Sequence, residues 1–118
     1  MTCSVPPSIN GFVIDTSWYW FATNDYVVGS WLKDWISTGA GADRIYAGAG
    51  ADTIYSGSGA DYVDAGAGDD LVYAGTGDDL VYGGSGADRL YGQAGNDRIH
   101  GGDGADVIDV GAGVNYAW

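Results

Sequence analysis

The chain has 118 residues and a formal net charge of −12 at pH 7, since all sixteen of its acidic residues are aspartates and it has only four lysines and arginines. This length suits a single domain. The negative charge repels nucleic acid and anionic membrane surfaces, which excludes both as expected partners. No stretch approaches the roughly 20 apolar residues of a membrane-spanning helix. Repulsion among so many carboxylates would oppose folding unless a counter-charge enters the structure, and a divalent cation is the obvious candidate.

The first segment, residues 1–37, is rich in aromatic residues and contains four of the five tryptophans. Its first residues lack the positive charge and the uninterrupted apolar core of a signal peptide. Cys3 is the single cysteine, so no internal disulfide is expected. Its thiol is therefore idle, buried or paired with another chain.

A nine-residue period begins within this segment, because Asp25 and Asp34 precede Asp43 at that spacing. The same phase assigns Val27, Ile36 and, one unit earlier, Trp18 to the core. Glycine is missing from the turns, where Phe21, Thr23, Ser30 and Leu32 stand instead, and Lys33 next to Asp34 argues against a bound cation there. Two interpretations of residues 11–37 remain open: degenerate coils that continue a solenoid, or an ordinary cap that seals its core.

Residues 38–109 form eight complete nine-residue units, in which the sixth position is always aspartate and the fourth always glycine. The second position is glycine in all units but one, where Gln93 replaces it. The aspartates are Asp43, Asp52, Asp61, Asp70, Asp79, Asp88, Asp97 and Asp106. An aliphatic residue follows each of them at the eighth position: Ile45, Ile54, Val63, Val72, Val81, Leu90, Ile99 and Ile108. A fixed period of this length indicates a solenoid.

The repeat predicts an all-β fold in which the first six positions of a unit form a turn and the last three form a strand. Glycine permits tight turns with inward-pointing carbonyls, and triplets such as Arg44-Ile45-Tyr46 favour strand. Two units make one coil, so about four regular coils place two parallel sheets around a column of aliphatic side chains, with degenerate coils at both ends. One aliphatic side chain per unit contributes about 1.5–3 kcal/mol, which does not offset an ordering cost of about 1 kcal/mol per residue. The turns must supply the difference.

Calcium is the ion that such turns would bind, because it takes six to eight oxygen ligands from carboxylates and backbone carbonyls. Alternate units share an edge, so Asp43, Asp61, Asp79 and Asp97 would line one side and the other four aspartates the opposite side. One ion between successive turns on each edge gives about six ions. The expected ligands are the eight aspartates with the carbonyls around Gly39, Gly41, Gly48, Gly50, Gly57, Gly59, Gly66, Gly68, Gly75, Gly77, Gly84, Gly86, Gly95, Gly102 and Gly104.

The run from Thr38 to Asp109 resembles the RTX (repeats-in-toxin) or hemolysin-type calcium-binding family, whose nonapeptide is G-G-x-G-x-D-x-U-x. The resemblance implies a right-handed parallel β-roll that is disordered without calcium, in an extracellular protein that leaves bacteria by type I secretion. The chain departs from the family at Gln93, which weakens the expected site near Asp97. The family's long C-terminal secretion segment is not found within residues 1–118.

Residues 110–118 continue the phase as a degenerate coil, with Gly111 and Gly113 in the turn, Asn115 in the aspartate position and Tyr116-Ala117-Trp118 in the strand. Aromatic residues at both ends, on open parallel strand edges, favour head-to-tail stacking of copies into a filament or surface layer. The outward rows Tyr55, Tyr73, Tyr91 and Tyr46, Tyr82 are expected to stack along the sheets. They would also suit a glycan or a partner chain.

We therefore expect a non-catalytic, extracellular, calcium-dependent structural β-roll. The one histidine, His100, lies in an outward strand position with no nucleophile paired to it, which argues against an enzyme. The alternative is a calcium-binding module of a larger secreted enzyme, toxin or adhesin. An ice-binding module is disfavoured, because the third and fifth turn positions carry mostly alanine and serine rather than rows of threonine and asparagine.

Overall fold

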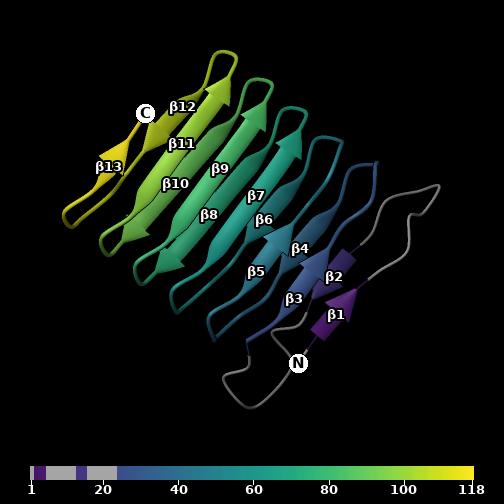
Figure 1. The fold of residues 1–118 in the computed structure, drawn as a ribbon, viewed down its shortest axis with the longest axis horizontal. Coiled ribbons are helices and arrows are strands. Elements are labelled where there is room, and N and C mark those ends of the chain that lie inside the picture. The colour runs from purple at the N-terminus through teal and green to yellow at the C-terminus, as the bar shows by residue number, and fades with distance from the viewer. Residues whose placement is uncertain (1, 5–12, 16–23) are drawn as a thin grey trace.

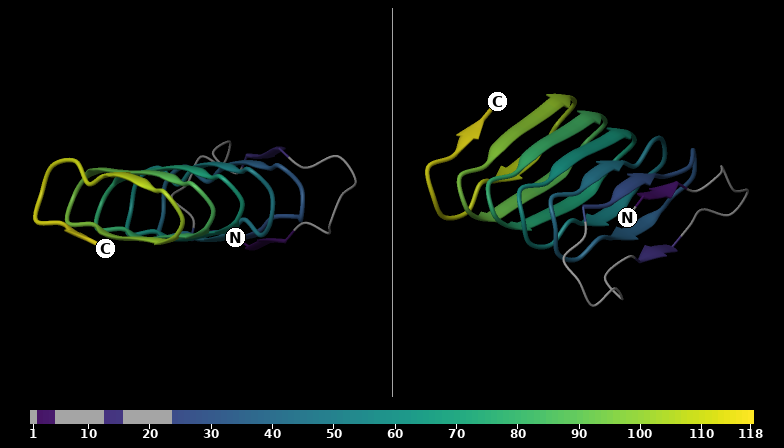
Figure 2. Two further views of the ribbon diagram at one scale, coloured as in Figure 1. Left: turned by 90° about the horizontal axis from the view of Figure 1, so that it is seen from above. Right: turned by 60° about the horizontal axis from the view of Figure 1, so that its bottom comes forward.

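The computed structural model describes residues 2–4, 13–15 and 24–118, and every regular element among them is a β-strand. Seven strands form one parallel sheet: β1 (Thr2–Ser4), β3 (Tyr26–Val28), β5 (Arg44–Tyr46), β7 (Tyr62–Ala67), β9 (Leu80–Ser85), β11 (Arg98–Asp103) and β13 (Tyr116–Ala117). Six form the other: β2 (Val13–Asp15), β4 (Trp35–Ser37), β6 (Thr53–Tyr55), β8 (Leu71–Thr76), β10 (Arg89–Ala94) and β12 (Val107–Asp109). The chain alternates between the two sheets and climbs as a flattened coil (Figures 1 and 2). The parallel β-solenoid expected from the period is therefore confirmed.

The coil repeats every 18 residues from β3 onward. Val27 lies beside Ile45, Ile45 beside Val63, and Val63 beside Val81 in one sheet. The other sheet keeps the same register, with Ile54 beside Val72. Because side chains alternate across a strand, this register directs every eighth-position aliphatic residue inward.

The core is one continuous column between the sheets. Its buried aliphatic members from the eighth position are Val27, Ile36, Ile45, Ile54, Val63, Val72, Val81, Leu90 and Ile99. A second inward row comes from the first position, where Ala47, Ala65 and Ala74 are fully buried with Thr38 and Ser56. The expectation of a single inward residue per unit is therefore wrong. Strands β7 to β11 extend through the third position of the next unit, so the first position is strand rather than turn.

The first coil departs from the nine-residue phase. Ile14 of β2 lies beside Ile36, and Cys3 of β1 lies beside Val27, so these steps span 22 and 24 residues rather than 18. The place beside Ile36 that the phase assigns to Trp18 is thus taken by Ile14, while Trp18 itself lies outside the described residues. From β3 the degenerate units do continue the solenoid, because β3 pairs with β5 and β4 pairs with β6 in full register.

The glycine turns depend on close contact between coils. Gly59 has a φ of 125°, and a Cβ placed on it would lie 1.8 Å from the carbonyl oxygen of Gly41 in the preceding coil. Gly57 has a φ of 98° and meets the carbonyl of Gly39 in the same way. The carbonyls at the second and fourth positions therefore point along the stack toward the next coil, and the expected inward direction is wrong for them. Glycine at these positions lets the coils approach this closely without a clash from a Cβ.

Candidate calcium-binding turns

The turn aspartates form two buried columns, one on each edge of the roll. In each column the backbone N–H of one aspartate donates to Oδ1 of the aspartate 18 residues later, as Asp43 does to Asp61 and Asp52 does to Asp70, both at 2.8 Å. The pattern continues to Asp106 on one edge and to Asn115 on the other. The predicted division into two edges is the one that these hydrogen bonds show. The bonds themselves follow from no sequence motif, because a carboxylate that reaches the next coil's backbone is visible only after the coils stack.

The second carboxylate oxygen of these aspartates is buried without a hydrogen bond. Within the described part of the chain this holds for Oδ2 of Asp43, Asp52, Asp61, Asp70, Asp79, Asp88 and Asp97. Oδ2 lies inside the aspartate's own turn, because a Cβ built on the first-position glycine would touch it: 2.6 Å for Gly83 and Asp88, and 2.5 Å for Gly92 and Asp97. A buried carboxylate oxygen without a donor costs free energy on the order of several kcal/mol as an ion, so each turn calls for a proton or a cation.

Asn115 shows what an uncharged substitute does in the same place. Its Oδ1 accepts from the Asp97 N–H at 2.7 Å, as an aspartate would. Its Nδ2 donates to the carbonyls of Val110 at 3.0 Å and Gly111 at 3.3 Å, the first two positions of its own turn. In the aspartate turns an oxygen replaces this nitrogen. Carboxylate oxygens and backbone carbonyls are the kinds of ligand that calcium prefers.

In the Asp34 turn, protein groups alone satisfy the second carboxylate oxygen. Its Oδ2 accepts from the backbone N–H of Ser30 at 2.6 Å and from the Ser30 hydroxyl at 3.1 Å. Ser30 occupies the second position, where the regular turns have glycine. This contact supports the interpretation that the Asp34 turn binds no strong cation, and it supplies a better reason than the neighbouring charge of Lys33.

Burial raises the pKa values of six carboxyls in the columns, from Asp52 to Asp97. Desolvation is the largest cause, and the neighbouring aspartates of the same column add repulsion, while the backbone N–H bond opposes the shift. The pKa rises from 3.8 to about 7 for Asp52, Asp61 and Asp70, and to about 6 for Asp79. The pKa values of Asp88 and Asp97 are raised for the same first reason. Near neutral pH the metal-free carboxyls of Asp52, Asp61 and Asp70 are therefore divided between protonated and ionised forms.

Backbone carbonyls must provide most of the ligands for any ion. Among the residues that the structure describes, no group of three or more histidine, cysteine, aspartate or glutamate side chains could hold a metal. Second-position carbonyls such as those of Gly39 and Gly48 already accept interstrand N–H bonds at 2.8 and 2.9 Å. The fourth-position carbonyls of Gly59 and Gly77 accept no backbone hydrogen bond from the described residues, so they are more available as ligands for an ion. The individual ligands and the number of ions stay predictions.

Gln93 keeps the shape of the turn that it interrupts. It has a φ of 73° and is the one non-glycine residue with positive φ in residues 24–118. Its carbonyl still accepts from the Ala112 N–H at 2.8 Å, and Asp97 still accepts from the Asp79 N–H at 3.0 Å. The site near Asp97 is thus geometrically like the others, at the cost of a strained residue.

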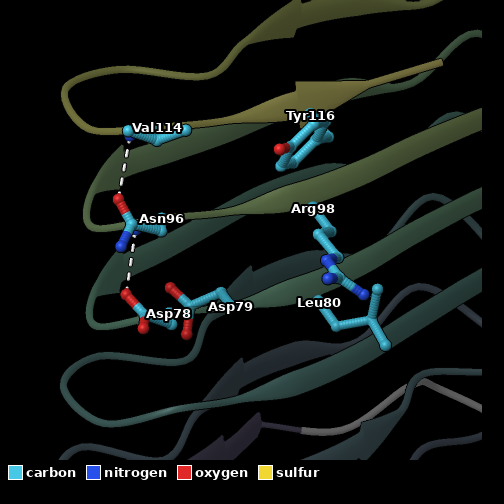
Figure 3. Close-up of a pocket in the computed structure, with 7 residues that line it drawn as sticks. All are labelled: Asp78, Asp79, Leu80, Asn96, Arg98, Val114 and Tyr116. Atoms are coloured by element: carbon cyan, nitrogen blue, oxygen red, sulfur yellow. Dashed lines mark hydrogen bonds between the residues drawn. The ribbon is translucent and has the colours of Figure 1, made fainter.

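A second, exposed set of side-chain bonds runs beside the columns at the fifth position. Asp78 Oδ1 accepts from the Asn96 N–H at 2.9 Å, and Asn96 Oδ1 accepts from the Val114 N–H at 2.8 Å (Figure 3). Asn24 and Asp69 do the same for Ala42 and Ala87. In these bonds the N–H belongs to the later residue of the pair, whereas in the columns it belongs to the earlier residue. These bonds were not predicted, although aspartate or asparagine at the fifth position, as in Asp69, Asp78 and Asn96, is a signal for this role.

A sequence comparison now identifies the repeat. The model of the RTX calcium-binding nonapeptide repeat (4 copies) matches residues 28–63, 55–90 and 82–117. Because these matches cover most of the chain, the protein belongs to this family, and the resemblance stated from the repeat is confirmed. It is a calcium-binding β-roll module. No curated protein matches the chain. The described residues include no helix that is long and apolar enough to cross a membrane.

Proposed function

We propose that this chain is a structural protein of the extracellular space that folds when calcium enters its turns and then stacks end to end into a filament or layer. The buried Oδ2 atoms of seven turn aspartates are the observation that carries this proposal. They make the folded state costly without a positive charge in each turn. The family is typical of secreted bacterial proteins, and extracellular calcium would complete the fold after export.

The exposed C-terminal coil supports end-to-end association. Strands β12 and β13 are the last strands of their sheets, and within the described part of the chain their outer edges have no neighbouring strand (Figure 1). This coil also exposes large apolar side chains: Val107 is 55% exposed, Val114 68%, Tyr116 60% and Trp118 57%. Strands β1 and β2 are the last strands at the opposite end. A second copy added in line would continue both parallel sheets and cover this apolar surface.

We infer no catalytic role for the chain. His100 lies in a row of aromatic rings, 5.9 Å from the Tyr82 ring centroid and 5.3 Å from that of Trp118. The eight turn carboxyls recur at a fixed period and have a structural role, since each one accepts a backbone N–H from the preceding coil. A carbohydrate could contact the outward tyrosines, but these rings already stack on one another.

Sedimentation velocity tests the proposal directly. The purified chain is measured with excess chelator and again with millimolar calcium. We expect an expanded, slowly sedimenting monomer that calcium converts into large species which chelator disperses. A compact monomer in calcium would instead support the folding switch but favour a module of a larger secreted protein. No response to calcium would overturn the assignment of the turn aspartates as ligands.

A further inference from the structure

The outward face of the six-stranded sheet carries a short, regular stack of tyrosine rings. Tyr55, Tyr73 and Tyr91 occupy the ninth position of β6, β8 and β10, which are neighbours in this sheet (Figure 1). The Tyr55 and Tyr73 ring centroids are 5.1 Å apart with an interplanar angle of 6°, and those of Tyr73 and Tyr91 are 4.9 Å apart at 10°. The three rings are therefore almost parallel and in face-to-face contact.

The aromatic row on the opposite sheet has a different geometry. There Asp64 takes a ninth position between Tyr46 and Tyr82, so the rings zigzag through Tyr62. Centroid distances are 5.6 and 5.8 Å, and the rings are tilted by 45° and 47°. The chain thus contains, in one molecule, a parallel tyrosine stack and a tilted one for comparison.

The rings of the parallel stack are partly exposed, and the Tyr55 ring also meets the Trp35 ring, which is tilted by 50° at a centroid distance of 5.9 Å. Tyr55 is 39% exposed, and Tyr73 and Tyr91 are half-buried. Tyr91 has Tyr73 on one side and Asp109 on the other, so Tyr73 is its one tyrosine neighbour in register. A reaction that joins two tyrosine rings at Tyr91 therefore has a single expected partner.

We propose that Tyr73 and Tyr91 are a site of oxidative cross-linking, at which a peroxidase with hydrogen peroxide joins adjacent coils through a dityrosine bond. Each phenol loses one electron and its hydroxyl proton to become a phenoxyl radical. The two radicals form a carbon–carbon bond between ring carbons next to the oxygens, and the hydrogen on each of those carbons then moves to its oxygen. The peroxide accepts two electrons and two protons and leaves as two waters. Parallel rings in contact hold the two radicals together long enough to couple.

The bond would close an 18-residue loop between two successive coils. A cross-link of this kind stabilises a fold mainly because it restricts the unfolded chain. Calcium first brings the two rings into contact, and the covalent bond then keeps the coils together if calcium is withdrawn. The inference rests on calcium-dependent folding, but it concerns a different face of the roll.

The positions of the arginines allow the cross-link to be detected directly in tryptic peptides. Trypsin cleaves after Arg44, Arg89 and Arg98, so it releases residues 45–89 and 90–98 as separate peptides, and Tyr91 is the one tyrosine of the second. The full chain is treated with peroxidase and hydrogen peroxide in calcium, quenched, digested in chelator and analysed by mass spectrometry. We expect these two peptides joined, two hydrogen atoms lighter than their sum. We expect at least tenfold less of this product when chelator is present during oxidation.

Two variants distinguish cross-linking within the stack from effects of misfolding and of the number of tyrosines. Tyr73→Phe keeps the ring but lacks the phenol, and it should abolish the joined peptide. Tyr82→Phe removes a tyrosine from the tilted row of the same peptide and should leave the product unchanged. Circular dichroism during a calcium titration shows whether each variant folds, independently of cross-linking. A folded wild-type chain that yields no joined peptide, or a joined peptide that persists in folded Tyr73→Phe, would overturn the proposal.

Discussion

At the scale of single residues, the difference between aspartate and asparagine decides what a turn requires. Asn115 bonds to two carbonyls of its own turn with its amide, where the aspartates present an oxygen. Both residue types accept the N–H from the preceding coil through Oδ1. Each turn carboxylate therefore has one oxygen, Oδ1, with a structural role that an amide can take over. Its second oxygen, Oδ2, has an ion-binding role that an amide cannot take over.

Asp70 is the position at which the roles of the two carboxylate oxygens can be separated. In Asp70→Asn the Oδ1 acceptor for the Asp52 N–H remains, and the amide can donate to the carbonyls of its turn. We expect this variant to bind fewer calcium ions by isothermal titration calorimetry and to be more stable than wild type in chelator. Asp70→Ala removes the acceptor as well, and it should lose about 1–3 kcal/mol of stability in calcium because the Asp52 N–H is left buried and unsatisfied. Equal ion counts in wild type and Asp70→Asn would contradict this assignment.

Gln93 provides a stabilising substitution. A residue with a Cβ costs about 1–2 kcal/mol in the left-handed region, and Gln93 has a φ of 73°. Gln93→Gly should therefore raise the stability of the calcium-bound roll by about 1 kcal/mol, after the greater freedom of glycine in the unfolded chain is subtracted. Thermal unfolding followed by circular dichroism measures the change. A lower melting temperature would show that the glutamine side chain makes a contact more valuable than the strain.

At the scale of elements, the turn glycines set how closely coils approach. Gly59→Ala places a Cβ 1.8 Å from the Gly41 carbonyl oxygen at a φ of 125°, so the two coils must separate. We expect a loss of at least about 3 kcal/mol, in the range of the larger core substitutions, and little calcium-induced structure. Ser58→Ala, in the exposed third position next to it, is the matched control and should fold normally. Circular dichroism across a calcium titration compares the two variants.

The period predicted most of the elements because a nine-residue repeat fixes both the strand and its inward residue. The core column from Ile45 to Ile99 and the two aspartate edges follow from it. The inward row at Ala47, Ala65 and Ala74 does not, because small residues in a glycine-rich stretch look the same in a turn and in a strand. The side-chain bonds to the next coil were also missed, since they join residues 18 apart and depend on register. The longer first coil was missed because residues 12–23 contain no glycine to mark the phase.

At the scale of the whole molecule, protons and calcium compete for the same oxygens. Without calcium, a carboxyl whose pKa is raised by burial from 3.8 to about 7, as in Asp52, Asp61 and Asp70, favours the folded state while it is protonated. That contribution is complete below pH about 4 and is lost as the pH rises through 7. The calcium-free chain should therefore gain β-structure as the pH falls from 8 to about 5. Circular dichroism in chelator at several pH values tests this expectation, and structure that is unchanged or lost over this range would contradict it.

In the presence of calcium, the pH dependence of folding reverses. Ion binding requires ionised carboxyls, so the calcium concentration at half-folding should increase as the pH falls below about 7, where Asp52, Asp61 and Asp70 become protonated. Calcium titrations at pH 8 and pH 6 measure the shift. A midpoint that does not move would show that the carboxyls of the columns are not the groups that bind the ion.

The 18-residue coil also sets the step in which such a molecule can change its length. Removing residues 65–82 would take out one whole coil and join Asp64 to Gly83, so that every later strand stays in its own sheet and every aspartate in its own column. Removing residues 65–73 would take out half a coil, and all later strands would exchange sheets, which would place Tyr91 in the sheet opposite Tyr55. Gain or loss of two repeats therefore leaves every later residue on its own face of the roll. Gain or loss of one repeat moves every later residue to the opposite face.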